Sequence, residues 1–157
     1  MKGESMKSQA TYDDIDIILR LYEMRREDKL RKARAWFSAN FRVRNLDDFN
    51  RLCPTGSEEN AYFRMVASYW EMAASFITKG VLHQEIFFES GGEILFVWEK
   101  MRDIVPAYRE SRKNPIAFKN LETVANAYIE WMNQQAPEWY NVYRNMVRSG
   151  SSDPTKR

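Results

Sequence analysis

The sequence predicts an all-α fold, a single-domain bundle of five to seven helices around a central helix at residues 58–79. Apolar residues recur at helical spacing in one segment after another, and no segment alternates with a period of two between turn signals. The 157 residues include six glycines and five prolines, so few positions are specialised for tight turns. Aromatic residues make up 14% of the chain and supply a bulky core, and the length suits one domain.

We expect the helical domain to span residues 11–148, between flexible segments at 1–10 and 149–157. No uncharged run approaches the roughly 18 residues that a membrane-spanning helix needs. Residues 1–8 hold no apolar stretch of the kind that a secretory signal has. The chain is therefore expected to be cytoplasmic and to have no membrane partner.

The first helix is predicted over residues 12–26, because Thr11 and Asp14 have the spacing of a capping box. Its apolar residues fall on two nearly opposite faces. One face holds Ile15, Ile18, Leu19 and Tyr22, and the second holds Ile17, Leu21 and Met24. A helix that is apolar on two sides is either sandwiched or forms half of a subunit contact.

A second helix is predicted over residues 29–42, with Asp28 as its cap. One long bent helix through this region remains an alternative. A short helix follows at 46–52. It begins after Asn45 and ends at a Cys-Pro pair, since the residue before a proline disfavours helical geometry.

The central helix is predicted over residues 58–79, with Ser57 as its N-terminal cap and Gly80 as its stop. Apolar side chains cover most of its circumference, namely Tyr62, Phe63, Met65, Val66, Tyr69, Trp70, Met72, Ala73, Phe76 and Ile77. A narrow polar stripe completes it, formed by Arg64, Ser68, Glu71, Ser75 and Thr78. A helix that is apolar on about three sides belongs at the centre of a bundle.

The C-terminal half is predicted to hold helices over residues 81–89, 93–111, 115–135 and 137–148. Gly91 and Gly92 permit a sharp reversal before the second of these. Pro106 lies inside that helix and is expected to kink or break it before Ala107. The inner face of the last helix is predicted to consist of Trp139, Val142, Tyr143, Met146 and Val147.

Residue counts exclude several classes of site. Cys53 is the only cysteine and His83 the only histidine, so the chain can hold neither an internal disulfide nor a zinc cage of Cys and His. The di-iron site of helical bundles needs two histidines and is excluded in the same way. No dinucleotide-binding or phosphate-binding glycine loop is present. Cys53 and His83 stay open as a catalytic pair, but roles at helix ends are the simpler interpretation.

The net charge of +2 conceals an uneven distribution. Residues 20–44 carry nine Lys and Arg against three acids, whereas residues 45–99 carry three against nine. Opposite blocks of this kind favour complementarity within the chain or between subunits over a nucleic-acid surface. We therefore do not expect nucleic acid as a partner.

These observations favour a non-enzymatic interaction module that self-associates, as a homo-oligomer, or binds a protein partner. Its candidate interface residues are Ile17, Leu21, Met24 and Phe96. Phe96 is included because it falls on the charged side of its helix. We predict no metal, no cofactor and no catalytic residue, and we do not expect an enzyme, although a pair of acid–base carboxylates stays open.

The alternative is a small-molecule-binding or sensor domain with a pocket beside the helix 58–79. Its candidate ligand-binding residues are Tyr62, Arg64, Tyr69, Glu71 and Trp98. Arg64 and Glu71 lie about two turns apart on the polar stripe. Their candidate partners on neighbouring helices are Glu93, Glu99 and Arg102. Such a pair would fix the register of two helices, which is the simpler interpretation, or form part of a site.

One stretch of the chain also resembles a known family. It consists of Tyr69-Trp70-Glu71-Met72, Ile77, Gly80-Val81-Leu82, Glu85, Phe88, Trp98, Pro106, Arg109, Phe118 and Leu121. This pattern is similar to a widespread bacterial family, domain of unknown function 4760. The resemblance covers residues 60–121 and also includes 21–41. It implies a helical fold, and it brings no catalytic residue with it.

Overall fold

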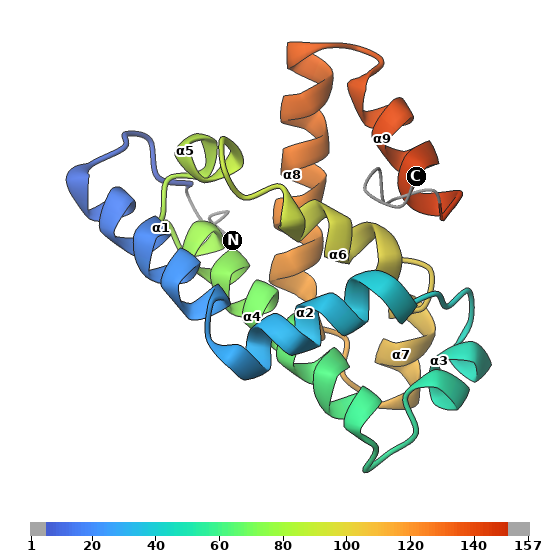
Figure 1. The fold of residues 1–157 in the computed structure, drawn as a ribbon. Coiled ribbons are helices and arrows are strands. Elements are labelled where there is room, and N and C mark those ends of the chain that lie inside the picture. The colour runs from blue at the N-terminus through green and yellow to red at the C-terminus, as the bar shows by residue number, and fades with distance from the viewer. Residues whose placement is uncertain (1–5, 151–157) are drawn as a thin grey trace, which may run out of the picture.

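The computed structural model describes residues 6–150, and this part of the chain contains nine helices and no strand (Figure 1). The helices are α1 (Tyr12–Arg25), α2 (Asp28–Asn40), α3 (Leu46–Leu52), α4 (Glu58–Thr78), α5 (Gln84–Phe88), α6 (Glu93–Met101), α7 (Val105–Ser111), α8 (Lys119–Gln135) and α9 (Trp139–Arg148). The all-α prediction is confirmed. The predicted number of five to seven helices is too low, because the segment 93–111 forms two helices and the short helices predicted at 46–52 and 81–89 are both present, the second as α5.

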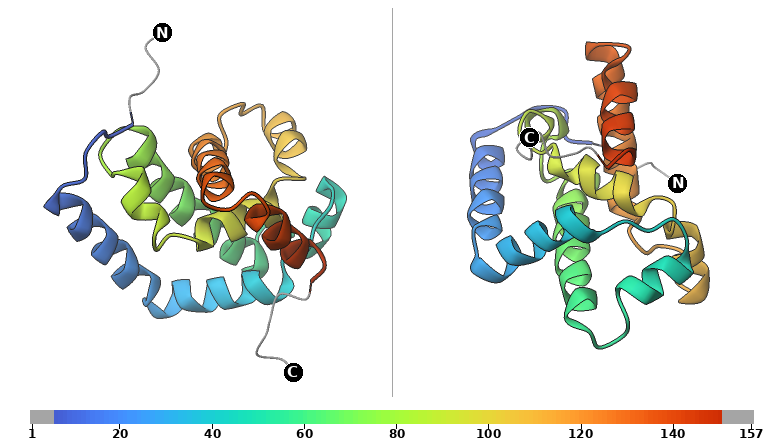
Figure 2. Two further views of the ribbon diagram at one scale, coloured as in Figure 1. Left: turned by 90° about the horizontal axis from the view of Figure 1, so that it is seen from above. Right: turned by 45° about the vertical axis from the view of Figure 1, so that its right-hand side comes forward.

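Helix α4 is the longest helix described, and it packs against α2, α8 and α6. Helices α6, α8 and α9 contact one another in the C-terminal half. Helices α1 and α2 meet at a corner and together form an arc beside α4 (Figure 2). Helix α4 therefore contacts segments from both halves of the sequence.

The ends of α4 follow from local chemistry. The Ser57 hydroxyl accepts a hydrogen bond from the Asn60 N–H at 3.1 Å and so caps the first turn. Gly80 has a φ of 75°, a left-handed conformation that glycine adopts at low cost after a helix. Both predicted ends of this helix are confirmed to within one residue.

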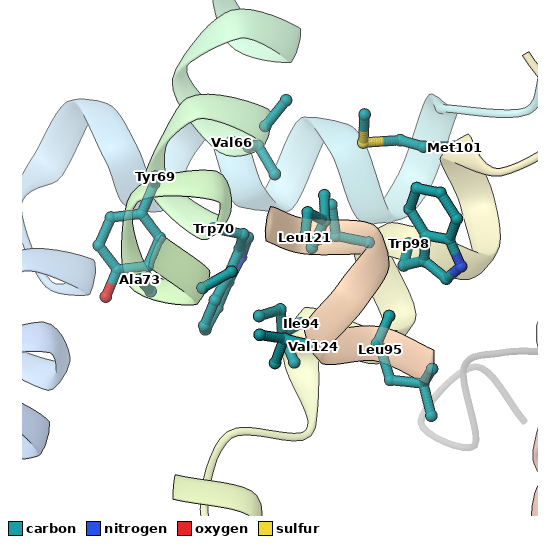
Figure 3. Packing of buried hydrophobic residues seen from close by; sticks show 14 of the residues in the cluster. Val66, Tyr69, Trp70, Ala73, Ile94, Leu95, Trp98, Met101, Leu121 and Val124 are labelled. Carbon is teal, nitrogen blue, oxygen red and sulfur yellow. The ribbon is translucent and has the colours of Figure 1, made fainter. Parts of the chain in front are cut away.

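The core is built from large side chains of α4, α6 and α8. Figure 3 shows Trp70 of α4 beside Ile94 of α6 and Val124 of α8, with Leu121 above them. All four side chains are at most 2% exposed. Burying a large apolar side chain stabilises a fold by about 1.5–3 kcal/mol. Because Trp70 comes from the first half of the chain and the other three from the second, their burial holds the two halves together.

The break between α1 and α2 is real, and the alternative of one long bent helix is wrong. Helix α1 ends at Arg25 and α2 begins at Asp28. The cap of α2 is Glu27 and not the predicted Asp28, since the Glu27 carboxylate accepts a hydrogen bond from the Leu30 N–H at 2.9 Å. A carboxylate in this position satisfies an N–H group that the first turn would otherwise leave unpaired.

The predicted helix 93–111 is interrupted by a turn at residues 102–104, which separates α6 from α7. Pro106 lies in the first turn of α7, where its missing N–H costs no helical hydrogen bond. The break therefore comes before the proline, and the predicted break before Ala107 is wrong. Helix α8 also begins later than predicted, at Lys119, because Phe118 has a left-handed φ of 57°.

The predicted inner face of the last helix is correct in part, since Tyr143 packs against the core and Val147 is half-buried, but it omits Tyr140. Tyr140 is the buried residue of α9, whereas Val142 and Met146 are 56% and 48% exposed. The Tyr140 hydroxyl donates a hydrogen bond to Glu99 at 2.6 Å, and it lies 2.9 Å from the Arg102 guanidinium. This polar anchor orients the short helix, and periodicity of apolar residues does not reveal it.

The predicted flexible ends are only partly described. Residues 1–5 and 151–157 lie outside the described residues. Within the described part, Lys7 forms an ion pair with Asp14 at 3.0 Å. Among residues 6–150, no helix has the length and apolar character needed to span a membrane.

Candidate functional site

A shallow groove runs along one side of α4. It consists of two hollows of about 510 and 580 Å³ that meet at Ser68 and Met72. Its floor is a row of side chains at helical spacing, which are Met65, Ser68, Met72 and Ser75. Met65 and Met72 are only half-buried. The prediction that other helices cover all the apolar sides of α4 is therefore wrong on this side. In the sequence, both methionines lie beside the serines of the polar stripe, and this position could have predicted that they border an open face of the helix.

The first hollow lies where the corner of α1 and α2 approaches α4. It is lined by Met24, Glu27, Leu30, Met65, Ser68, Tyr69 and Met72. Three of these side chains are methionines, which are flexible and polarisable and adapt to partners of different shape. Met24 is 46% exposed at the edge of the hollow. An apolar, adaptable and open surface of this kind is typical of an interaction site.

The second hollow lies between α4 and the turn that precedes α8. It is lined by Ser68, Glu71, Met72, Ser75, Tyr108, Arg112, Asn114, Ile116, Ala117, Phe118 and Asn120. Ile116 is 71% exposed, so its side chain adds apolar surface to this hollow. The Arg112 guanidinium carbon lies 4.1 Å from the centre of the Tyr108 ring, which places a cation in this part of the groove.

Glu71 holds the wall of the second hollow in place. Its Oε2 atom accepts a hydrogen bond from the Leu121 N–H at 2.7 Å, and its Oε1 atom accepts from the Asn120 N–H at 3.1 Å. Thr78 lies about two turns further along α4, and its hydroxyl donates a hydrogen bond to the side-chain oxygen of Asn120 at 2.6 Å. Helix α8 has no side-chain cap of its own, so Glu71 of α4 supplies one.

Tyr69 holds the wall of the first hollow. Its ring is buried, and its hydroxyl donates a hydrogen bond to the Leu21 carbonyl of α1. Burial raises the pKa of Tyr69 to about 12, because the phenolate would be desolvated. The hydroxyl therefore stays protonated and serves as a donor between the two helices.

The outer face of α1 is a second exposed apolar surface, which we call the α1 stripe. It consists of Tyr12, Ile15, Leu19 and Tyr22, which are 79%, 38%, 56% and 38% exposed. The predicted contact face of α1, with Ile17, Leu21 and Met24, is the opposite one, and Leu21 at its middle is only 5% exposed. The buried Asp14 carboxylate accepts hydrogen bonds from the N–H groups of Thr11 and His83, at 2.6 and 2.9 Å, and so sets the rotation of α1.

The four predicted interface residues do not form one surface. Leu21 belongs to the core, and Ile17 is half-buried against it. The ring centre of Phe96 lies 6.4 Å from that of Phe37 in an edge-to-face contact, with the Lys100 ammonium 5.2 Å from the Phe96 ring. Met24 alone among the four is exposed, and it borders the groove.

The five predicted ligand-binding residues do not line a common pocket. Tyr69 and Trp98 are both buried, and Figure 3 shows them on opposite sides of the core cluster. The Tyr62 hydroxyl donates to Glu58 at 2.6 Å, and Arg64 donates to Asn60 of its own helix at 3.1 Å.

Glu71 is engaged by the N-terminus of α8, so none of the three charged partners suggested by the sequence pairs with it. The hydrogen bonds of Tyr62, Arg64 and Glu71 are all made within the chain. The pocket built from these five residues is therefore not a feature of the fold.

The opposite charge blocks meet inside the molecule. Arg34 of α2 forms a two-pronged contact with Glu93 of α6, with Nε and Nη2 each 2.9 Å from a carboxylate oxygen. Arg25 of α1 lies 3.5 Å from the same carboxylate. This network joins three helices. It shows that part of the positive charge of residues 20–44 is paired with acidic residues within the chain.

Cys53 and His83 have structural roles. Cys53 is buried at the C-terminal end of α3, and burial, with a smaller effect of Glu59, raises the pKa of its thiol to about 11. The His83 Nδ1 atom accepts a hydrogen bond from the Ile86 N–H at 3.3 Å and caps α5. A thiol with a raised pKa is a poor nucleophile at neutral pH. The described residues contain no group of three or more His, Cys, Asp or Glu placed to hold a metal ion.

The helical fold and its groove can now be compared with known proteins. No curated protein and no solved structure matches this chain. The family model for a domain of unknown function, DUF4760, matches residues 10–147, which include every helix except the last residue of α9. This range is longer than the stretch 60–121 on which the resemblance was based. The chain belongs to the DUF4760 family.

Proposed function

We propose that this protein is a non-enzymatic interaction module that self-associates, with the α1 stripe of one copy lying in the groove along α4 of another. The observation that carries the proposal is the presence, on one chain, of two exposed apolar surfaces. One is a convex row of side chains on a helix, and the other is a hollowed face. Apolar surfaces of this kind mark interaction sites on soluble domains.

The dimensions of the two surfaces agree. The α1 stripe runs from Tyr12 to Tyr22 and the floor of the groove from Met65 to Ser75, so each covers eleven residues, or about 15 Å of helix. Tyr12, Ile15, Leu19 and Tyr22 recur at intervals of three and four residues. This is the spacing by which an amphipathic helix anchors itself in an apolar groove.

One set of charges at the edges is complementary. Asp16 and Glu23 are exposed on α1 and follow Tyr12 and Leu19 by one helical turn, which places them beside the stripe. Arg112 lines the groove, as do Glu27 and Glu71, whose carboxylates cap α2 and α8. Opposite charges at the rim favour the correct register of two surfaces and disfavour other partners.

Sedimentation equilibrium over a range of concentrations tests the proposal. We expect the native chain to associate, and the variants Leu19→Lys in the stripe and Met72→Lys in the groove each to be monomeric. Val142→Lys is the matched control, because Val142 has the same 56% exposure as Leu19 but lies on α9. Circular dichroism checks that all three variants remain folded.

Mixing the two monomeric variants sharpens the test. Leu19→Lys keeps an intact groove and Met72→Lys keeps an intact stripe, so the mixture is expected to regain association through one intact contact. A native chain that stays monomeric at high concentration overturns the proposal. Dissociation by Val142→Lys to the same extent, or a mixture that stays monomeric, also overturns it.

A further inference from the structure

A separate cavity of about 140 Å³ lies between the connection from α2 to α3, helix α6 and the end of α9. It is lined by Phe41, Arg42, Val43, Arg44, Glu99, Lys100, Asp103, Val147 and Arg148. A single water needs only about 10–15 Å³ of such space, so the cavity has room for a small molecule. In Figure 2 the end of α9 lies beside the end of α2, and the Arg42 guanidinium lies 3.5 Å from the Gly150 carbonyl oxygen.

Glu99 is one of the residues that line this cavity, and its carboxylate is buried. The residue is 4% exposed, and its Oε1 atom accepts hydrogen bonds from Arg102 at 3.0 Å and from Tyr140 at 2.6 Å. Its Oε2 atom is buried and has no hydrogen-bond partner among residues 6–150. Because a buried oxygen without a donor is costly, this atom marks a place for a ligand that donates a hydrogen bond.

The remaining charges of the cavity are mostly positive. Its cationic lining residues are Arg42, Arg44, Lys100 and Arg148, against the acids Glu99 and Asp103. The Lys100 ammonium donates to the carbonyl oxygens of Ser38 and Phe41, both at 3.1 Å, which uses two of its three donors. Arg148 contacts Asp103 at 3.3 Å, while its buried Nε has no partner among the described residues.

Burial, assisted by Arg42, lowers the pKa of Lys100 to about 8. A lysine with such a pKa lies in a site where its charge is poorly compensated. A bound anion would supply the missing negative charge. Lys100 and Glu99 both line the cavity, so both are near a ligand that occupies it.

We propose that this cavity is a binding site for a phosphate that retains a proton, either the inorganic ion or a small phosphate monoester. The charged oxygens of the ligand contact Lys100 and the arginines, and its O–H donates to the Oε2 atom of Glu99. A phosphate monoester has a second pKa of about 6, so it still carries a proton in part of its population near neutral pH. Sulfate has the same shape but no proton at this pH, so its oxygens would face the Glu99 carboxylate without a donor.

Isothermal titration of the native chain with potassium phosphate and with potassium sulfate, at neutral pH and equal ionic strength, tests the site. We expect saturable binding of one phosphate and binding of sulfate that is at least about tenfold weaker, because a hydrogen bond to a charged group contributes about 1.5–3 kcal/mol. Glycerol phosphate in a parallel titration shows whether the opening admits an ester. If inorganic phosphate binds and glycerol phosphate does not, the ligand is the free ion. If both bind, the site recognises the phosphate group of either compound.

Variants separate the site from nonspecific binding of anions. Lys100→Met keeps most of the half-buried side chain and removes its charge, so it is expected to weaken phosphate binding by at least about tenfold. Glu99→Gln provides an N–H donor in place of an acceptor and is expected to reduce the preference for phosphate over sulfate. Lys119→Met, which removes an exposed cation of α8, is the matched control and should bind as the native chain does.

Several results would overturn the proposal. They are no phosphate binding by the native chain, equal affinity for sulfate, and undiminished binding by a folded Lys100→Met variant. None of them bears on self-association, which uses other surfaces of the molecule.

Discussion

The carboxylate of Glu71 caps helix α8 through the backbone N–H of Leu121, fifty residues further along the chain, at 2.7 Å. The first turn of α8 has no capping side chain of its own, since Phe118 precedes it in a left-handed conformation. The contact fixes the register of α4 against α8, and these two helices make one of the largest contacts in the bundle. A side chain that the sequence offers as part of a ligand site is therefore a structural link.

Replacing this carboxylate tests the link. Glu71→Gln keeps the shape of the side chain but removes the charge that faces the N–H groups of α8. We expect it to lower the free energy of unfolding by about 1–2 kcal/mol, the usual cost of losing a helix cap. Urea denaturation measures the loss, and Glu130→Gln on the exposed side of α8 is the control. Equal stability of the two variants would contradict the capping role.

Two adjacent glycines make a matched pair with opposite expectations. A Cβ on Gly91 would lie 2.8 Å from the Phe87 carbonyl oxygen, closer than such atoms can pack. A Cβ on Gly92 would meet its nearest neighbour, the Tyr128 hydroxyl, at an ordinary 3.5 Å. We expect Gly91→Ala to destabilise the fold by about 1–3 kcal/mol and Gly92→Ala to stay within about 0.5 kcal/mol of the native chain. Thermal unfolding of both variants decides the matter, and a reversed order would contradict the close packing at Gly91.

Acid stability should depend on Asp14. Burial alone would raise the pKa of this carboxyl, but hydrogen bonds from the N–H groups of Thr11 and His83 and from Lys7 outweigh it and hold the pKa below its ordinary 3.8. The folded state therefore binds this proton less tightly than the unfolded state. The stability that Asp14 contributes is complete above the ordinary pKa and is lost as the pH falls through the lower pKa of the folded state.

The measurement is the free energy of unfolding of the native chain and of Asp14→Asn from neutral pH to strongly acidic pH. We expect the native chain to be the more stable by a constant margin above about pH 5, and this margin to shrink below the ordinary pKa. Asp16→Asn, an exposed carboxylate on the same helix, should show no such trend. A margin that is independent of pH would show that Asp14 acts only by shape.

The network around Glu93 should show measurable coupling. Arg34 contacts both oxygens of this carboxylate, and the two side chains are 22% and 25% exposed. A double-mutant cycle with Arg34→Met and Glu93→Gln is expected to give a coupling of about 1 kcal/mol, which decreases with added salt because part of the pair is exposed to solvent. The control cycle uses Arg31 and Asp28, an exposed pair on α2, where coupling should be smaller. Equal coupling in both cycles would contradict a special role for Glu93.

Helix positions were predictable because their ends depend on near neighbours. The caps at Asn45 and Ser57 and the stop at Gly80 use hydrogen bonds or backbone conformations within about one helical turn, and all three are confirmed. The membership in the DUF4760 family was likewise predictable from residues at packing and turn positions. The turn at residues 102–104 was missed because it contains neither glycine nor proline.

Composition and local residue spacing suffice to predict that this chain is helical, where most helices begin and end, and which sites its residue counts exclude. The buried apolar face of α1 depends on the folded chain, because periodicity identifies both faces as apolar and Asp14 selects between them through the distant N–H of His83. The same holds for Glu71, Tyr140 and the cavity at Glu99, whose partners are about 40 to 50 residues distant in the sequence. Long-range polar contacts of this kind leave no local pattern, and they set the groove and the cavity on which the proposed functions rest.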